Sequence, residues 1–266
     1  MKRHALARGL LSTALLAISP PVLAGDGAKA SLSILPGWRA DNGTHVAALR
    51  IMLAPDWVTY WRIPGDAGIP PQLDLQDSNS ISGASLSWPR PTAEVKNGLR
   101  SFVYYDEVIV PLTLSISAEA QDVPISGQIN IGVCQDVCIP TVIKFNAILP
   151  AQKTAPDPKI AAALANGPRK GSARIECQFA PSPEGMSLQV TLNSPAIDNK
   201  EVAIVEHRDP TTWTRTTGQE RSGNRLSVSS EIISDGTMPS LQRRDIRLTM
   251  LGQKEMIEYD GCSAPS

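Results

Sequence analysis

Hydrophobic and polar residues alternate with a period of two along much of the first half of the chain. A period of two places successive side chains on opposite faces of a strand, so each such segment predicts a half-buried β-strand. Turn-rich stretches, such as the Asp-Asn-Gly sequence at residues 41–43 and residues 79–84, separate the pieces. The alternating segments are residues 30–34, 47–53, 108–116 and 128–149.

The second half of the chain repeats this pattern in shorter pieces. The alternating segments are residues 174–179, 186–192, 202–206, 213–217, 226–233 and 246–259. Residues 183–185 (Pro-Glu-Gly) and 252–254 (Gly-Gln-Lys) are typical of hairpin turns between them. The 22 prolines and 19 glycines interrupt short strands, and no long amphipathic helix is expected. The chain therefore has the pattern of an all-β protein built of β-sandwiches.

A change of composition separates the two halves. Prolines and glycines cluster between residues 150 and 171, as is typical of a boundary between compact units. One short helix is expected there, because Asp157 can cap it, Pro158 suits its first turn, and Gly167 can terminate it. The expected organisation is a β-sandwich at residues 25–150, a Pro-rich linker with one small helix at 151–171, and a second, smaller β-domain at 172–266.

The first 24 residues have the pattern of a secretory signal peptide. A basic start precedes the apolar stretch Leu10–Ile18, and Val22-Leu23-Ala24 resembles a cleavage site. This stretch is shorter than the about 20 residues that span a bilayer, and no later segment reaches that length. We therefore predict export to the periplasm without stable membrane insertion. An uncleaved signal acting as an anchor is the alternative.

Charge argues against a nucleic acid partner. Removing residues 1–24 takes away three basic residues and no acidic one, so 25 basic against 26 acidic residues become 22 against 26, about −4 overall. Nucleic acids are bound through clustered Lys and Arg, and the sequence has no basic tract.

Four cysteines follow the signal segment, in a compartment where disulfides persist. Four cysteines allow three pairings. Cys177 lies in the first strand of the second β-domain and Cys262 just past its last, so we expect them to form a structural disulfide. That bridge closes a loop of about 85 residues and constrains the unfolded chain by roughly 4 kcal/mol.

The other two cysteines, Cys134 and Cys138, are expected at the end of a hairpin. Ile129, Ile131 and Val133 share one strand face, which places Cys134 on the opposite face, away from the core. Four residues of straight strand span about 13 Å, whereas disulfide-bonded Cα atoms lie within about 7 Å. The chain must therefore reverse across residues 135–137 for the two cysteines to bond.

The short spacing favours thiol–disulfide exchange over structural stapling. A small ring gains little from loop-closure entropy. Exchange needs one thiol that reaches a partner's disulfide and a second thiol near enough to resolve the mixed disulfide. We therefore expect Cys134 and Cys138 to lie on the exposed side of the hairpin. An ordinary surface disulfide and a metal site are the alternatives. His45 and His207 lie far away in sequence, so no metal or cofactor is predicted.

Several motifs together resemble a known family. They are Trp57-Val58-Thr59-Tyr60-Trp61-Arg62-Ile63-Pro64-Gly65-Asp66-Ala67-Gly68-Ile69-Pro70-Pro71, Trp88-Pro89, Tyr104-Tyr105 with Val110-Pro111-Leu112, and Val133-Cys134-Gln135-Asp136-Val137-Cys138-Ile139-Pro140. In this order they resemble the periplasmic N-terminal domain of the DsbD and ScsB thiol:disulfide interchange proteins, more closely the ScsB version. The resemblance covers residues 30–150. Residues 151–266 resemble the second immunoglobulin-like subdomain of ScsB-type proteins only in length, linker and strand pattern.

The resemblance implies an immunoglobulin-like sandwich in which Cys134 and Cys138 are the exchanging pair. In that family the pair receives electrons from a membrane-embedded thiol relay, of the DsbD or CcdA kind, and passes them to thioredoxin-fold periplasmic proteins, including those of cytochrome c maturation. The hypothesis is a protein-disulfide reductase component. Family members continue into a multi-span membrane domain, so a separate membrane electron source is expected here. The alternative is a non-catalytic periplasmic module that binds a protein partner or handles copper.

The sequence also predicts where the aromatic and charged residues of these motifs pack or form ion pairs. Trp57, Tyr60 and Trp61 are expected in the sandwich core, and Arg62 and Asp66 are expected to form an ion pair at the Pro-Gly turn. Family members shield the redox pair with an aromatic loop. By this resemblance the candidates for the shield are Phe102, Tyr104 and Tyr105, and core packing is their alternative.

Overall fold

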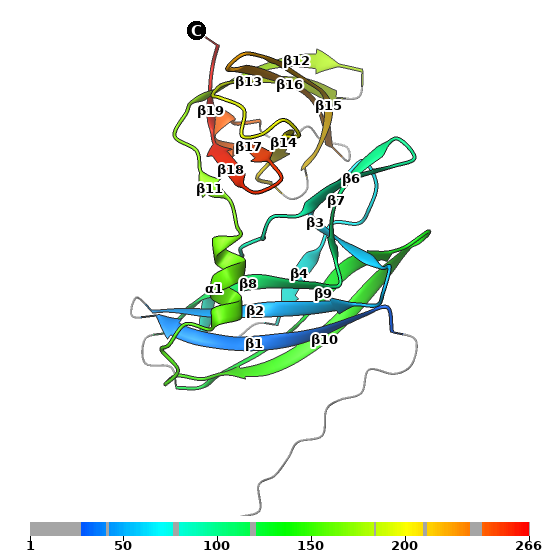
Figure 1. Ribbon diagram of the computed structural model, residues 1–266. Coiled ribbons are helices and arrows are strands. Elements are labelled where there is room, and N and C mark those ends of the chain that lie inside the picture. Colours follow the sequence, from blue (N-terminus) through cyan, green and yellow to red (C-terminus); the bar gives the residue numbers. More distant parts are fainter. Residues whose placement is uncertain are drawn as a thin grey trace, which may run out of the picture.

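The computed structural model describes residues 28–40, 43–76, 80–117, 121–183, 185–209, 212–234 and 241–265. The expected signal peptide lies outside the described residues. The described residues form mostly β-strands, as Figure 1 shows. Among them are one α-helix and one short 3-10 helix. The first ten strands are β1 (Ala30–Ala40), β2 (Thr44–Leu53), β3 (Val58–Gly65), β4 (Gln72–Leu75), β5 (Ile81–Leu86), β6 (Thr92–Lys96), β7 (Leu99–Tyr105), β8 (Glu107–Ile116), β9 (Val123–Cys134) and β10 (Cys138–Leu149). The remaining elements are α1 (Pro158–Ala165), β11 (Arg169–Lys170), β12 (Ile175–Ser182), β13 (Gly185–Asn193), β14 (Val202–His207), β15 (Thr212–Ser222), β16 (Arg225–Ser234), η1 (Arg243–Asp245), β17 (Ile246–Leu251), β18 (Met256–Asp260) and β19 (Cys262–Ser263).

Strands β1 to β10 form two sheets, which we call the N-terminal sandwich. One sheet has the order β1-β2-β8-β5, and the other has the order β10-β9-β3-β7-β6, with β4 paired to β9. All these pairs are antiparallel. The period-two pattern explains this arrangement, because alternate residues of β2, β8 and β9 face the space between the sheets.

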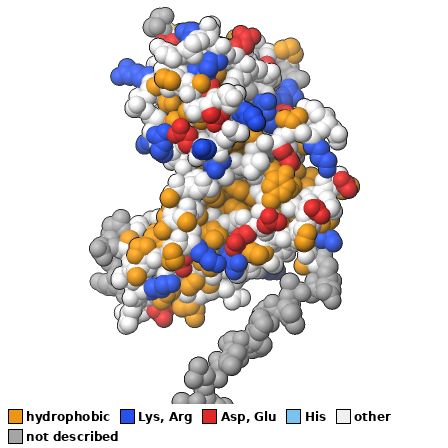
Figure 2. Space-filling model, in the orientation of Figure 1, with side chains coloured by type: hydrophobic (Ala, Val, Ile, Leu, Met, Phe, Trp, Pro, Cys, Tyr) orange, Lys and Arg blue, Asp and Glu red, His pale blue; other side chains and the backbone are white. Residues whose placement is uncertain are grey.

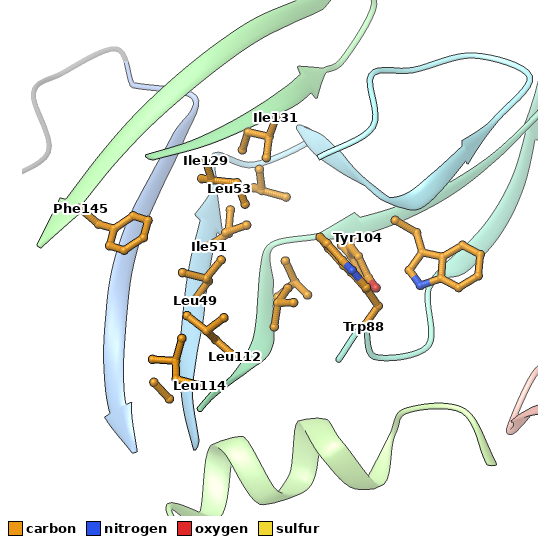
Figure 3. Packing of buried hydrophobic residues seen from close by; sticks show 14 of the residues in the cluster. Leu49, Ile51, Leu53, Trp88, Tyr104, Leu112, Leu114, Ile129, Ile131 and Phe145 are labelled. Atoms are coloured by element: carbon orange, nitrogen blue, oxygen red, sulfur yellow. The ribbon is translucent and has the colours of Figure 1, made fainter. Parts of the chain in front are cut away.

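The core of the N-terminal sandwich is filled by branched aliphatic side chains. Figure 3 shows residues of both sheets meeting there, among them Leu49, Ile51, Leu112, Leu114, Ile129 and Ile131, all at most 1% exposed. Burying one such side chain contributes roughly 1.5–3 kcal/mol. These residues therefore hold the two sheets face to face.

Strands β11 to β19 form the C-terminal sandwich. Its sheets have the orders β11-β18-β17-β14 and β15-β16-β13-β12-β19. The pairs are antiparallel except β11 with β18 and β12 with β19. The structure thus confirms the all-β, immunoglobulin-like fold class. The structure joins Cys177 to Cys262 by a disulfide, with Cα atoms 5.7 Å apart.

The short helix connects the two sandwiches along the chain and packs against β8 of the N-terminal sandwich (Figure 1). The Asp157 carboxylate accepts hydrogen bonds from the backbone N–H groups of residues 159 and 160, and Pro158 opens the helix, as expected from the sequence. The helix ends at Ala165 with Asn166 as its C-cap, and Gly167, the expected terminating residue, follows directly and donates its N–H to the carbonyl of Leu164 at 3.0 Å. Ile160 is fully buried and anchors the helix.

The two sandwiches are in direct apolar contact. Ile204 of β14, Leu251 of β17 and Met256 of β18 pack into the same buried cluster as the core of the N-terminal sandwich. Figure 2 shows hydrophobic side chains gathered where the two sandwiches meet. The contact is therefore part of a continuous core.

Candidate functional site

The β9–β10 hairpin brings Cys134 and Cys138 together. The two cysteines are directly opposite in the antiparallel register, with Cα atoms 4.1 Å apart, and form a disulfide. The chain reverses across residues 135–137, where the N–H of Gln135 donates to the carbonyl of Val137 at 3.4 Å. The reversal lies where the spacing argument requires it.

The two sulfurs have different environments. Cys134 is only 3% exposed and packs in a small cluster with Val58, Tyr60 and Val103, whereas Cys138 is exposed. The expectation that both cysteines lie on an exposed side is therefore wrong for Cys134. Its strand face was predicted correctly, but on that face the side chains of Val58, Tyr60 and Val103, from β3 and β7 of the same sheet, pack around Cys134. Of the two sulfurs, that of Cys138 is therefore the more accessible to an incoming partner.

Tyr60 contacts the exposed sulfur. Its hydroxyl lies 3.3 Å from Cys138 Sγ, and because a disulfide sulfur carries no hydrogen, the tyrosine hydroxyl donates. Burial, followed by the negative charge of Glu94, raises the pKa of Tyr60, so the hydroxyl keeps its proton. Tyr60 is buried as expected, but in the cysteine cluster rather than the main core. Only the family resemblance of its sequence block could have placed it near the pair.

Two glycines allow the Tyr60 ring to fit. A Cβ atom at Gly68 would lie 2.4 Å from the ring, and one at Gly132 would lie 3.3 Å from it and 2.9 Å from Ile69 Cβ. The backbone of Gly68 has a φ of +125°, which side-chain-bearing residues rarely adopt. The ring is therefore confined between the segment before β4 and strand β9.

An open cavity of about 410 Å³ lies beside the disulfide. The β6–β7 hairpin forms one wall, and Lys96 Nζ donates to the carbonyl of Gln135 at 3.1 Å and contacts Asp136 Oδ1 at 3.4 Å. Tyr105 lines the cavity and donates a hydrogen bond to Glu94, which, with burial, raises the pKa of Tyr105 to about 12. Polar groups thus surround the exposed sulfur.

The three candidate shielding aromatics have different places. Tyr105 is 43% exposed at the cavity. Phe102 belongs to the main core and makes an edge contact with Trp61, and Tyr104 is buried there with its hydroxyl donating to the carbonyl of Pro89 at 2.6 Å. For Phe102 and Tyr104 the structure therefore gives the core-packing alternative.

Arg62 does not pair with Asp66, so that expectation is wrong. Arg62 instead reaches the C-terminal sandwich, where its guanidinium donates to Glu206 at 2.7 and 2.9 Å and to Glu258. Asp66 accepts from the backbone N–H of Arg100 at 2.8 Å. Burial alone would lower the pKa of Arg62, but the charges and hydrogen bonds of Glu206 and then Glu258 outweigh it and raise the pKa. The partners lie 144 and 196 residues away, beyond the reach of local sequence patterns.

Two further properties concern the part of the chain that the structure describes. Within it, no three or more His, Cys, Asp or Glu side chains gather in a way that would hold a metal ion. None of its helices combines the length and the apolar character needed to cross a membrane.

Comparison with known proteins identifies the first sandwich. Residues 31–150 match the family described as "Thiol:disulfide interchange protein DsbD, N-terminal". Residues 31–150 are a DsbD N-terminal domain. The match contains both cysteines of the hairpin and the block around Tyr60.

Among solved structures, the chain resembles the N-terminal periplasmic domain of ScsB from Proteus mirabilis. The TM-score is 0.67 at 20% sequence identity, over 94% of this chain and 97% of that one. This similarity shows the fold and extends beyond the DsbD N-terminal domain into the C-terminal sandwich. A marsupial T cell receptor matches with a TM-score of 0.21 and 12% identity over 87% of this chain and 99% of that one, which is too low for any inference. No curated protein matches the sequence.

Proposed function

We propose that this protein is a periplasmic thiol–disulfide exchanger that passes electrons from a membrane-embedded thiol relay to thioredoxin-fold oxidoreductases through Cys134 and Cys138. The observation that carries the proposal is the unequal pair at the hairpin tip, with an exposed Cys138 beside the Tyr60 hydroxyl and a buried Cys134. Membership of residues 31–150 in the DsbD N-terminal family supports it. The ScsB structure of the same fold is described as a periplasmic domain, which supports the proposed location.

The oxidised pair accepts two electrons in two exchange steps. A thiolate of the reduced donor attacks Cys138 Sγ, the bond to Cys134 breaks, and Cys134 leaves as a thiolate that takes up a proton. The donor's second thiolate then attacks the donor sulfur of the mixed disulfide, so the donor leaves as a disulfide and Cys138 is released as a thiolate. The reduced pair repeats these steps in reverse on an oxidised acceptor, with Cys138 as nucleophile and Cys134 as resolving thiol.

Tyr60 has a direct role in this scheme. Its hydroxyl donates to Cys138 Sγ, and a hydrogen bond to a charged acceptor is stronger than one to a neutral acceptor. The contact therefore stabilises the Cys138 thiolate more than the disulfide, both when Cys138 leaves and when it attacks. Cys134, by contrast, is 3% exposed among Val58, Tyr60 and Val103, and burial in such surroundings disfavours a thiolate. This difference favours Cys138 as the sulfur that forms the mixed disulfide.

Trapping the mixed disulfide tests the proposal. Cys134→Ser leaves Cys138 without its resolving thiol. With a thioredoxin whose resolving cysteine is replaced by Ser and whose other cysteine carries a thionitrobenzoate mixed disulfide, Cys138 should displace thionitrobenzoate and accumulate a covalent adduct that survives acid quenching and non-reducing electrophoresis. Cys138→Ser should accumulate much less adduct, because Cys134 is 3% exposed. The wild-type protein should form none that persists.

The same variants separate the competing functions. If neither single variant forms an adduct, and the double Ser variant keeps the wild-type function in the periplasm, exchange is refuted and a non-catalytic binding module takes its place. Binding of copper by the double variant at wild-type affinity would place any copper site elsewhere in the chain.

A further inference from the structure

The regular pairing of strand β3 with its neighbouring strands is interrupted just after Tyr60. Its ladder with β7 runs from Val58 to Tyr60 and resumes only at Gly65, and its pairing with β9 is confined to Val58. Beyond that point β9 pairs with β4 instead. Among the described residues, the ladders therefore leave positions 61–64 without a strand partner, directly beside the tyrosine that contacts Cys138.

Arg62 ties this unpaired stretch to the C-terminal sandwich. Its side chain is 18% exposed and its partner Glu206 on β14 is 6% exposed. Glu258 on β18 makes a second ion pair, and the guanidinium lies over the Trp61 ring, 4.1 Å from its centroid. Thr249 donates to Glu206 at 2.7 Å and holds that carboxylate in place. The buried, two-sided contact is rigid compared with an exposed ion pair.

The direction of β3 links this contact to the cysteines. Val58 and Tyr60 pack on Cys134. Arg62 follows Tyr60 by two residues along β3, within the stretch where the register with β7 is irregular. The pairing with Val103 of β7 holds the backbone at Tyr60, and the Arg62 ion pairs hold the chain two residues further along β3.

From this geometry we infer that Arg62, clamped by Glu206 and Glu258, is a positioning residue that keeps the Tyr60 hydroxyl on Cys138. The inference rests on the proposed function. It assigns the C-terminal sandwich, which lies outside the DsbD family match, a part in the chemistry of the cysteine pair. The clamp acts through Tyr60 and not through the charge of Arg62 itself.

The test follows the pH dependence of Cys138 alkylation by iodoacetamide in a Cys134→Ser background, where Cys177 and Cys262 stay bonded. Tyr60→Phe should raise the pH midpoint by about one unit, the tenfold effect expected for one hydrogen bond to a thiolate. Arg62→Met should raise it in the same direction. In the Tyr60→Phe background, Arg62→Met should add nothing.

A second variant distinguishes positioning from direct charge. Glu206→Gln combined with Glu258→Gln weakens the clamp but leaves the Arg62 charge in place. Positioning predicts a raised midpoint, as for Arg62→Met. Direct attraction between Arg62 and the thiolate predicts a lowered midpoint, because the guanidinium is no longer neutralised. The combined Glu206→Gln and Glu258→Gln variant also tests the inference if the Arg62→Met protein fails to fold.

Arg221 is a matched control. It is 17% exposed and pairs with Glu201, which is 6% exposed, within the C-terminal sandwich. Arg221→Met should destabilise the protein and leave the midpoint unchanged. An unchanged midpoint in Tyr60→Phe or Arg62→Met, an additive shift in their combination, or a lowered midpoint in the Gln pair would each overturn the inference. Alkylation needs no protein partner, so these outcomes are independent of mixed-disulfide trapping.

Discussion

Three glycine-to-alanine substitutions test how tightly Tyr60 is confined beside the cysteine pair. They separate two effects that a new Cβ atom can have. At Gly98 the φ is +81° and no atom lies within 4 Å of the added carbon, so backbone strain acts alone. At Gly132 no positive φ is involved and the added carbon meets Ile69 and the Tyr60 ring. At Gly68 both effects operate.

The magnitudes follow from these contacts. Backbone strain of this kind costs about 1–3 kcal/mol and overpacking about 1–3 kcal/mol, and each Gly→Ala change regains about 0.4–1 kcal/mol by restricting the unfolded chain. Gly98→Ala and Gly132→Ala should therefore each lower the free energy of unfolding by about 1–2 kcal/mol. Gly68→Ala, with a carbon 2.4 Å from the ring, should lower it by about 2–5 kcal/mol.

Guanidinium titrations of the three variants measure these differences, provided that the slopes match the wild-type slope. The alkylation midpoint of Cys138 supplies a second reading. It should rise in Gly68→Ala and Gly132→Ala, which displace the Tyr60 ring, and stay unchanged in Gly98→Ala. If Gly68→Ala is no more destabilising than Gly98→Ala, the ring does not pack against residue 68 and the reasoning is refuted.

Two further predictions concern stability. His45 is fully buried, and this burial lowers its pKa below 6.5, although a hydrogen bond to a backbone carbonyl acts in the opposite direction. The unfolded state therefore takes up a proton at a higher pH than the folded state. The contribution of His45 to stability is complete above pH 6.5 and falls as the pH drops below that value. His45→Gln should flatten this part of the pH profile in thermal unfolding, and an unchanged profile would contradict the assignment. The Cys177–Cys262 disulfide spans 85 residues and the Cys134–Cys138 disulfide spans four. In the entropic model, removing the first should lower the free energy of unfolding by about 4.6 kcal/mol, and removing the second by about 2 kcal/mol. Mild dithiol should reduce the second bond first, as mass-mapped alkylation would show, and equal resistance of both bonds would count against exchange.

The strands were predictable because the sheets of both sandwiches are half-buried. Where one face meets the core and the other meets solvent, a period of two appears in the sequence, and β2, β8 and β16 begin and end within three residues of the expected segments. The helix was predictable from its cap, since Asp157 and Pro158 act on adjacent backbone groups. Both kinds of signal are local.

The environment of the cysteines was not predictable in the same way. The spacing of Cys134 and Cys138 required a chain reversal, and it lies there. The cover over Cys134 comes from β3, more than 70 residues earlier in the chain, and a strand pattern says nothing about which strand lies next to it. The ion pair expected between Arg62 and Asp66 failed for this reason, because closeness in sequence is a poor guide to the partners of a long, buried side chain.

Neighbouring residues of the sequence block from residue 57 to residue 66 make contacts of three different kinds. Trp61 is fully buried in the main core, Tyr60 packs in the separate cysteine cluster, and the Arg62 side chain lies over the Trp61 ring and reaches the second sandwich. One strand therefore anchors the main core through Trp61, contacts the cysteine pair through Tyr60 and contacts the second sandwich through Arg62. A single-residue shift of register would move Trp61 out of the core and Tyr60 away from Cys138 together. Because these contacts depend on one strand register, the residues form a single sequence motif, although they serve packing, chemistry and domain contact separately.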